Sequence, residues 1–123
     1  MLKTKYLFVC TINVMRSRTA QDYFRVQKLG QDYEFKSCGV DIKKIEKNKD
    51  GLCKLSVPIS QELCEWADII LVMENDHASF IKEKYGYGMR EKTVVLGIPD
   101  IYDYMQPELC MILNQKVKFG LEK

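Results

Sequence analysis

Short apolar segments, each about the length of one buried strand, are the feature that most constrains how this chain can fold. Three near-continuous runs rich in valine and isoleucine cover residues 6–9, 69–73 and 94–98, and a weaker alternating run covers 33–38. Runs that are apolar on both faces are typical of strands in a parallel sheet whose two faces are covered by helices. All of them are far too short to cross a bilayer, so we expect no membrane partner.

Segments with helical periodicity separate these strands. Helices are predicted over residues 17–29 with a stop at Gly30, after an N-cap at Ser60, after an N-cap at Asn75 or Asp76, and from Pro107 onward. The alternation of strands and helices predicts an α/β fold with a doubly wound parallel sheet. At this length we expect one domain over residues 1–123. The long polar connection at 41–56 is expected to hold a short helix.

Cysteine and histidine content limits the chemistry that the chain can perform. The five cysteines are an odd number without a C-x-x-C pair, and we see no export signal, so we expect reduced thiols in a cytoplasmic protein. The single histidine, His77, argues against a histidine zinc site or a serine–histidine triad, and we interpret it as a surface residue. We interpret cysteines 38, 53, 64 and 110 as structural. The formal net charge of +2 gives no indication of nucleic acid binding, and we expect neither metal nor cofactor.

The segment FVCTINVMRS joins the first predicted strand to the first predicted helix. Ligands of open α/β sheets bind outside the carboxyl ends of the strands, and the amides of such a loop, with the helix N-terminus, suit a phosphate-sized anion. Arg16 can grip two oxygens of that anion, and the same amides favour a nucleophilic thiolate at Cys10. Ser17 can add a hydroxyl donor to the sulfur. The residues expected to bind phosphate are Thr11, Ile12, Asn13, Val14, Met15, Arg16 and Ser17. The alternative is a buried cysteine at a strand end followed by a surface arginine.

The same segment resembles the phosphate loop of the low-molecular-weight protein tyrosine phosphatases, V-C-x-G-N-x-C-R-S-P, with Cys10, Asn13, Arg16 and Ser17 in register. The similarity is closer to a shorter bacterial branch of that family, which reads FVCSxNxxRSPTAE, SAG, EWADxIxVME and IPDxYxxMxPEL. The counterparts here are FVCTINVMRSRTAQ, SCG, EWADIILVME and IPDIYDYMQPEL, within residues 6–113. The resemblance implies the family's three-layer fold, with four parallel strands in the order 2-1-3-4.

Three positions of the loop depart from the pattern of the longer enzymes. Ile12 replaces a glycine, which would strain the loop if that position needs a positive φ. Met15 replaces a second cysteine, so the thiol that could form a protective disulfide with Cys10 is absent. Arg18 replaces a proline, and we interpret it as a solvated first-turn residue rather than as added positive charge at the rim.

A thiolate that attacks a phosphate monoester needs an acid to protonate the leaving oxygen, and without a metal this acid is a carboxyl group. Asp100 follows the fourth predicted strand, at the same edge of the sheet as Cys10. The resemblance places the family's general acid at Asp100, with Asp103 in the same loop as the nearest competitor. It also implies that an aromatic residue beside the acid walls the substrate slot, which indicates Tyr102. Tyr104 is expected to pack the loop onto the last helix.

Together these inferences predict a metal-independent phosphomonoester hydrolase. The resemblance makes it a cysteine-dependent protein tyrosine phosphatase that acts through a phosphocysteine, on a phosphotyrosine-bearing protein or a small aryl phosphate. Three alternatives stay open: an arsenate reductase on the same fold, which needs further cysteines to relay a disulfide; a phosphotyrosine-binding module without turnover; and a carrier that accepts phosphate on cysteine. Neither the physiological substrate nor the oligomeric state follows from the sequence.

Overall fold

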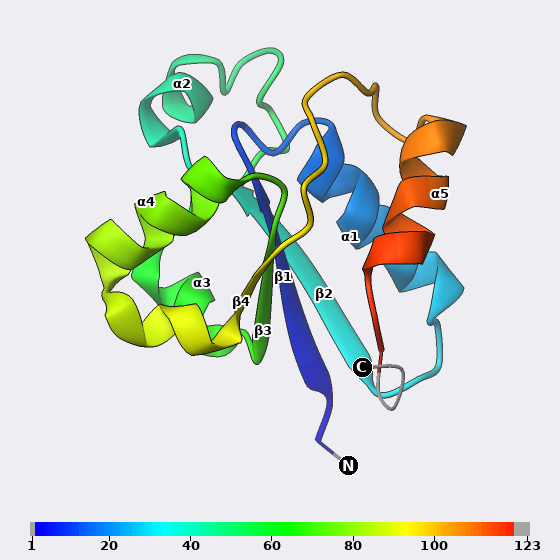
Figure 1. The fold of residues 1–123 in the computed structure, drawn as a ribbon. Coiled ribbons are helices and arrows are strands. Elements are labelled where there is room, and N and C mark those ends of the chain that lie inside the picture. The colour runs from blue at the N-terminus through cyan, green and yellow to red at the C-terminus, as the bar shows by residue number, and fades with distance from the viewer. Residues whose placement is uncertain (1, 120–123) are drawn as a thin grey trace.

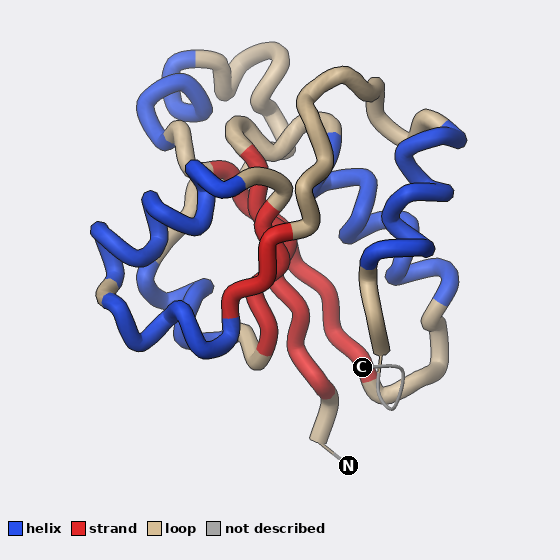
Figure 2. The backbone as a smooth tube through the Cα atoms, viewed as in Figure 1, coloured by secondary structure: helices blue, strands red, loops and turns tan. Residues whose placement is uncertain are grey.

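The computed structural model describes residues 2–119 of the chain, and it has a four-stranded parallel sheet at its centre (Figures 1 and 2). The strands are β1 (Thr4–Cys10), β2 (Tyr33–Gly39), β3 (Ile69–Val72) and β4 (Thr93–Val95). Their order is β2-β1-β3-β4 and all neighbouring pairs are parallel, which confirms the predicted sheet and its strand order. The predicted single domain of 1–123 also includes residues 1 and 120–123, which lie outside the described range.

Helices cover both faces of the sheet. They are α1 (Arg16–Gln27), α2 (Ile42–Lys47), α3 (Gln61–Trp66), α4 (Asn75–Tyr85), the short 3-10 helix η1 (Tyr87–Lys92) and α5 (Pro107–Lys116). Figure 1 shows α1 and α5 on one face and α3 and α4 on the other. Within residues 2–119, none of the helices combines the length and the apolar character that a membrane span requires.

Strand β1 is buried on both faces because its side chains alternate between two cores. Tyr6, Phe8 and Cys10 belong to the core beneath α1 and α5, whereas Leu7 and Val9 belong to the core beneath α3 and α4. Burial of each large apolar side chain contributes about 1.5–3 kcal/mol. The end of β1, and therefore Cys10, is fixed at the carboxyl edge of the sheet between β2 and β3.

Strand β4 differs from its prediction. It ends at Val95 rather than at residue 98, and Val94 and Val95 are 49% and 38% exposed because β4 lies at an edge of the sheet. The expectation that this run is covered on both faces is therefore wrong. The backbone beyond β4 still runs beside β3, since Leu96 N donates to Val72 O at 2.8 Å. This extension leads directly to Asp100.

The helix ends follow the sequence signals in most places. The Ser60 hydroxyl caps α3 by accepting a hydrogen bond from Leu63 N at 3.1 Å, and Pro107 opens α5, as predicted. Helix α2 is the short helix expected within 41–56. The N-cap of α4 is Glu74, so the predicted cap at Asn75 or Asp76 is wrong by one or two positions.

Candidate active site

The segment from Thr11 to Met15 turns from the end of β1 into α1 and lies against the chain that leaves β2. Val40 N donates to Cys10 O at 3.0 Å, and Asp41 N donates to Thr11 O at 2.9 Å. Gly39, which is level with Cys10 in the sheet, lies so close to the turn that a Cβ atom would be 2.7 Å from Thr11 O. The glycine therefore lets the two segments pack together.

The sulfur of Cys10 has polar neighbours on the side of α1. Ser17 Oγ lies 2.9 Å from Cys10 Sγ, and Asn13 N donates to the same sulfur at 3.3 Å. The Ser17 hydroxyl also lies 3.3 Å from Cys38 O, so its one proton has two possible acceptors. With a neutral thiol, the serine can donate to Cys38 and accept from the sulfur; with a thiolate, it can donate to the sulfur.

Asn13 is the one residue of this turn in the left-handed conformation. Its φ is 60°, and among the described non-glycine residues only Met105 shares a positive φ. The buried Asn13 side chain donates to Ser17 Oγ at 2.7 Å and accepts from Val57 N at 2.9 Å. Asparagine tolerates this conformation better than most residues do. Ile12 does not have a positive φ, so the missing glycine causes no backbone strain there.

Arg16 is buried and is held from several sides. Its Nη1 donates to Ile98 O at 2.8 Å and to a carboxylate oxygen of Glu74. Its Nη2 donates to Thr11 Oγ1 at 3.4 Å, and its Nε lies 3.6 Å from Asp100 Oδ1. A buried guanidinium needs such partners, because an unpaired buried charge is costly. The alternative of a surface arginine is excluded.

These groups meet in one small pocket of about 180 Å³. It is lined by Cys10, Thr11, Ile12, Met15, Arg16 and Asp100. The structure therefore brings the predicted nucleophile, cation and acid to one cup, and the Asp100 side chain is 65% exposed at its rim. Asp103 does not line the cup. Its main chain forms a turn into α5, with Asp103 N donating to Gln106 Oε1 at 2.9 Å.

A groove of about 600 Å³ adjoins the cup, and Met15 lines both. Tyr104 lines this groove and donates to Asp22 Oδ2 of α1, a contact that the sequence did not predict. Tyr102 is half-buried against the core beneath α1 and α5 and does not line the cup. Arg18 also lines the groove and donates to Leu55 O, so it is held by the 51–56 segment rather than freely solvated.

His77 is not the surface residue that the sequence suggested. It is only 1% exposed, its Nδ1 accepts from Glu74 N at 3.1 Å, and its Nε2 lies 3.1 Å from Thr11 Oγ1. Burial lowers the pKa of His77, and Arg16 lowers it further, while the nearby carboxylates of Asp76, Glu74 and Asp100 oppose the shift. We therefore treat His77 as neutral at neutral pH.

Glu74 and His77 are the site residues that sequence reasoning missed. Glu74 directly follows the apolar run at 69–73, just as Asp100 follows the fourth predicted strand. A search for carboxylates at the carboxyl ends of strands would therefore have found both. Candidate ligand atoms of Glu74, Asp76 and His77 lie within 4.8 Å of one another. Both ring nitrogens of His77 already have partners and Glu74 pairs with Arg16, so this cluster does not fit a metal as it is arranged.

Two of the other cysteines lie on the far side of the sheet from Cys10. Cys38 and Cys64 lie in the core beneath α3 and α4, on the face of the sheet opposite to Cys10. Burial raises the pKa of both thiols, that of Cys64 to about 11. Neither is placed to relay a disulfide to Cys10.

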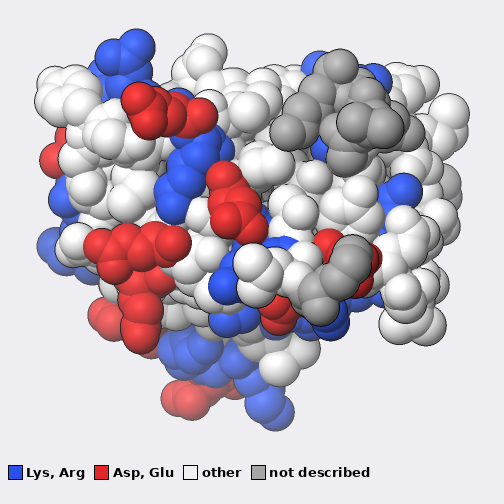
Figure 3. All heavy atoms as spheres, turned by 90° about the horizontal axis from the view of Figure 1, so that it is seen from below, with Lys and Arg blue, Asp and Glu red and all other residues white. Residues whose placement is uncertain are grey.

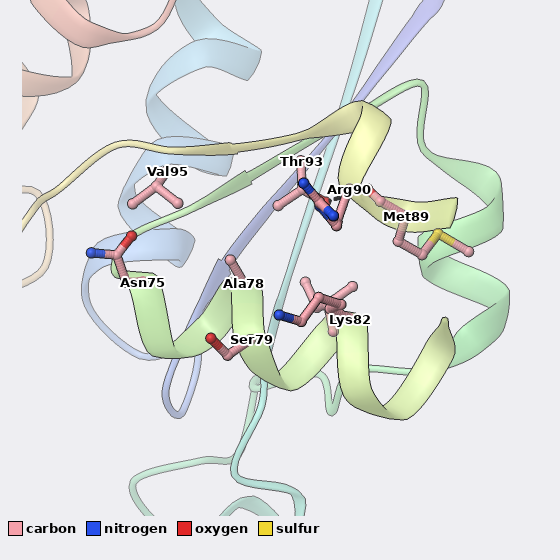
Figure 4. A pocket seen from close by; sticks show the side chains of 9 residues that line it. Asn75, Ala78, Ser79, Lys82, Met89, Arg90, Thr93 and Val95 are labelled. Atoms are coloured by element: carbon pink, nitrogen blue, oxygen red, sulfur yellow. Dashed lines mark hydrogen bonds between the residues drawn. The ribbon is translucent and has the colours of Figure 1, made fainter. Parts of the chain in front are cut away.

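The rest of the described surface offers no comparable site. A cavity of about 440 Å³ between α4 and β4 is lined by Lys82 and Arg90 among others, but by no cysteine or carboxylate (Figure 4). Figure 3 shows the face at the amino ends of the strands, where basic and acidic side chains are interspersed. The cup, where a nucleophile, a cation and an acid line one pocket, is therefore the candidate active site.

Comparison with known proteins agrees with this geometry. No protein-family model matches the chain. The protein-arginine-phosphatase of Bacillus subtilis is 27% identical over 141 aligned positions, which cover 91% of this chain and 93% of that protein. A solved mutant of the YwlE arginine phosphatase with a phosphorylated active-site serine is 26% identical, with a TM-score of 0.68 over 91% of this chain and 92% of its own. A low-molecular-weight protein tyrosine phosphatase from Streptococcus pyogenes, SP-PTP, shares the fold, with a TM-score of 0.71, 20% identity and coverage of 92% and 87%.

The chain is therefore similar in sequence to an arginine phosphatase, and it shares its fold with low-molecular-weight protein tyrosine phosphatases. The strand order β2-β1-β3-β4 matches the fold of these neighbours. The similarity supports a phosphatase, and the similar proteins are named as arginine phosphatases or as tyrosine phosphatases. The choice between these substrates has to come from the site itself.

Proposed function

We propose that this phosphatase hydrolyses phosphomonoesters without a metal, through a phosphocysteine on Cys10, and that its substrate is phosphotyrosine in a protein. The observation that carries the proposal is the cup, where Cys10, Arg16 and Asp100 line the same pocket of about 180 Å³. The Ser17 hydroxyl at 2.9 Å and the Asn13 amide at 3.3 Å supply the hydrogen bonds that a thiolate needs.

In the first step the Cys10 thiolate attacks phosphorus opposite to the leaving oxygen. The S–P bond forms as the P–O bond to the phenol breaks, and Asp100 gives its proton to the leaving oxygen. Arg16 and the amides of the turn hold the three equatorial oxygens. These amides are suited to the task because the first N–H groups of a helix have no intrahelical acceptor.

In the second step a water attacks the phosphocysteine. Asp100, now ionised, takes a proton from the water as the O–P bond forms and the S–P bond breaks, which releases inorganic phosphate and restores the thiolate. Glu74 and Ile98 O hold the guanidinium of Arg16 through both steps, so the cation is positioned before the substrate arrives.

The groove beside the cup favours an aromatic leaving group. Val14, Leu52, Leu55 and Tyr104 line it together with Met15, and they offer apolar surface to a phenyl ring. We propose that Tyr104, rather than Tyr102, forms the aromatic wall beside the substrate ring. Tyr102, the residue that the family resemblance indicates, would reach the ring only if its loop moved from its packed position.

Phosphoarginine is a second candidate because the curated relative is a protein-arginine-phosphatase. The same cup could break a P–N bond, with Asp100 protonating the leaving nitrogen. A guanidinium leaving group, however, is cationic when protonated and gains less than a phenol does from the apolar side chains of this groove. The arsenate reductase alternative is less favoured, since Cys38 and Cys64 lie across the sheet from Cys10. The free thiols suit the cytoplasmic location that we propose.

Hydrolysis of an aryl phosphate in EDTA tests this function. We expect Cys10→Ser to lose turnover but still bind vanadate, and Asp100→Ala to lose about 10²–10⁴-fold in kcat, less for weakly basic phenols. Asp103→Ala is the matched control and should keep near-wild-type rates. Full activity in Cys10→Ser would refute the mechanism. The ratio of kcat/KM for phosphotyrosyl and phosphoarginyl peptides of one sequence decides the substrate, and a higher value for phosphoarginine would refute the tyrosine proposal.

A further inference from the structure

We propose that the side-chain hydroxyl of Thr11 donates a hydrogen bond to the phosphoryl group in the cup, and that His77 from α4 holds the hydroxyl in that orientation. The inference rests on the proposed function and extends it. It assigns a role to the buried imidazole of His77, which the mechanism above does not use. It also adds a side-chain hydrogen-bond donor to the main-chain amides of the turn.

The tautomer of His77 follows from its neighbours. A main-chain N–H can only donate, so the contact from Glu74 N to His77 Nδ1 at 3.1 Å requires an unprotonated Nδ1. A neutral ring then carries its proton on Nε2. Nε2 lies 3.1 Å from Thr11 Oγ1, so the histidine donates and the threonine accepts.

The second lone pair of Thr11 Oγ1 is taken as well. Arg16 Nη2 donates to it at 3.4 Å, and a guanidinium has no acceptor. With two donors on its oxygen, the hydroxyl must direct its own proton elsewhere. Among residues 2–119 no acceptor is recorded for that proton, and Thr11 lines the cup. An oxygen of a bound phosphoryl group is the acceptor that fits.

The arrangement also couples α4 to the turn. Helix α4 begins where β3 ends, and its N-cap Glu74 binds both Arg16 and His77. A hydroxyl with a fixed direction donates to the developing charge without reorganisation, which is the condition for electrostatic stabilisation of a transition state. His77 is therefore a positioning residue, and Thr11 is the group that touches the substrate.

Two matched pairs of variants test the inference. Thr11→Val keeps the shape and removes the hydroxyl, whereas Thr11→Ser keeps the hydroxyl. We expect Thr11→Val to lower kcat/KM for an aryl phosphate about ten- to hundredfold, as for a hydrogen bond to a charged group, and Thr11→Ser to restore most of that loss. His77→Asn can keep the acceptor for Glu74 N but is too short to reach Thr11, while His77→Gln can reach it. We expect His77→Asn to lose activity and His77→Gln to recover it.

The double variant Thr11→Val/His77→Asn separates this coupling from a merely structural role. If His77 acts through Thr11, the double variant loses no more than Thr11→Val alone; independent losses that multiply would overturn the positioning role. In a crystal structure with vanadate, Thr11 Oγ1 should lie within about 3.0 Å of a vanadate oxygen, and a separation above about 3.5 Å would overturn the donation. Wild-type rates in Thr11→Val alongside an inactive Cys10→Ser would refute this inference and leave the proposed function intact.

Discussion

Replacement of Gly39 by alanine tests how tightly the cysteine turn is packed on β2. The added Cβ would lie 2.7 Å from Thr11 O, 2.8 Å from Ile45 Cδ1 and 2.9 Å from the carbonyl carbon of Ile12. Two of these three atoms are backbone, so they cannot swing away as a side chain can. The turn would have to retreat from β2 by about 0.7 Å to restore the 3.4 Å at which ordinary van der Waals contact begins.

The expected cost has two parts. Overpacking of this kind costs about 1–3 kcal/mol of the free energy of unfolding. Since Cys10 and Thr11 begin the cup, a shift of this size should also lower kcat/KM by about tenfold or more, because misplacement by 1 Å can cost about 10²-fold. Urea unfolding and hydrolysis of an aryl phosphate measure the two effects separately.

Gly88→Ala is the matched control, because a Cβ at Gly88 would meet nothing within 4 Å. Alanine there restricts the unfolded chain and should leave stability unchanged or raise it by about 0.4–1 kcal/mol. If Gly39→Ala proved as stable and as active as Gly88→Ala, the close approach of the turn to β2 would be refuted.

Three further predictions concern the groups around the cup and one helix cap. Asn13→Ala should lower the free energy of unfolding in urea by about 1–3 kcal/mol, since Ser17 Oγ and Val57 N lose a partner. Asn13→Gly should be about 1 kcal/mol more stable than Asn13→Ala, because glycine adopts a φ of 60° without strain. Equal stability of the two variants would contradict the left-handed conformation at this position. The pKa of His77 is lowered in the folded state, so its contribution to stability is complete above the unfolded pKa of 6.5 and is lost as pH falls through the folded pKa. The free energy of unfolding should therefore drop less between pH 7 and pH 5 in His77→Gln than in the wild type. Identical drops would refute the lowered pKa of His77. Ser60→Ala should cost about 1 kcal/mol through the lost cap of α3 without changing kcat/KM, whereas an altered kcat/KM would show that α3 supports the cup.

The residues of the cup that lie close together in the chain could be predicted from the sequence. A strand that ends on Cys10 and a helix that begins at Arg16 fix the turn between them, and the pattern of the first 17 residues contains both signals. Asp100 could be placed because parallel strands bring their carboxyl ends to one edge. The strand order itself came from the family resemblance, since local pattern does not determine which strands are neighbours.

The contacts between distant segments could not be predicted in the same way. The sequence around His77 is polar, which predicts a surface residue, yet the start of α4 places His77 against Thr11. The loop from Asp100 to Gln106 has no periodic pattern, so the contacts of Tyr102 and Tyr104 could not be predicted from the sequence. Its conformation depends on tertiary contacts such as the one between Tyr104 and Asp22.

The most direct measurement of the central claim is mass spectrometry of the enzyme denatured rapidly during turnover of an aryl phosphate. The account predicts that the peptide containing Cys10 gains the mass of one phosphoryl group. With an aryl phosphate whose phenol is weakly basic and leaves without an acid, this signal should accumulate further in Asp100→Ala, because hydrolysis of the phosphocysteine is then the slowed step. Continued release of phosphate with Cys10 never modified, or with the phosphoryl group on another residue, would contradict it.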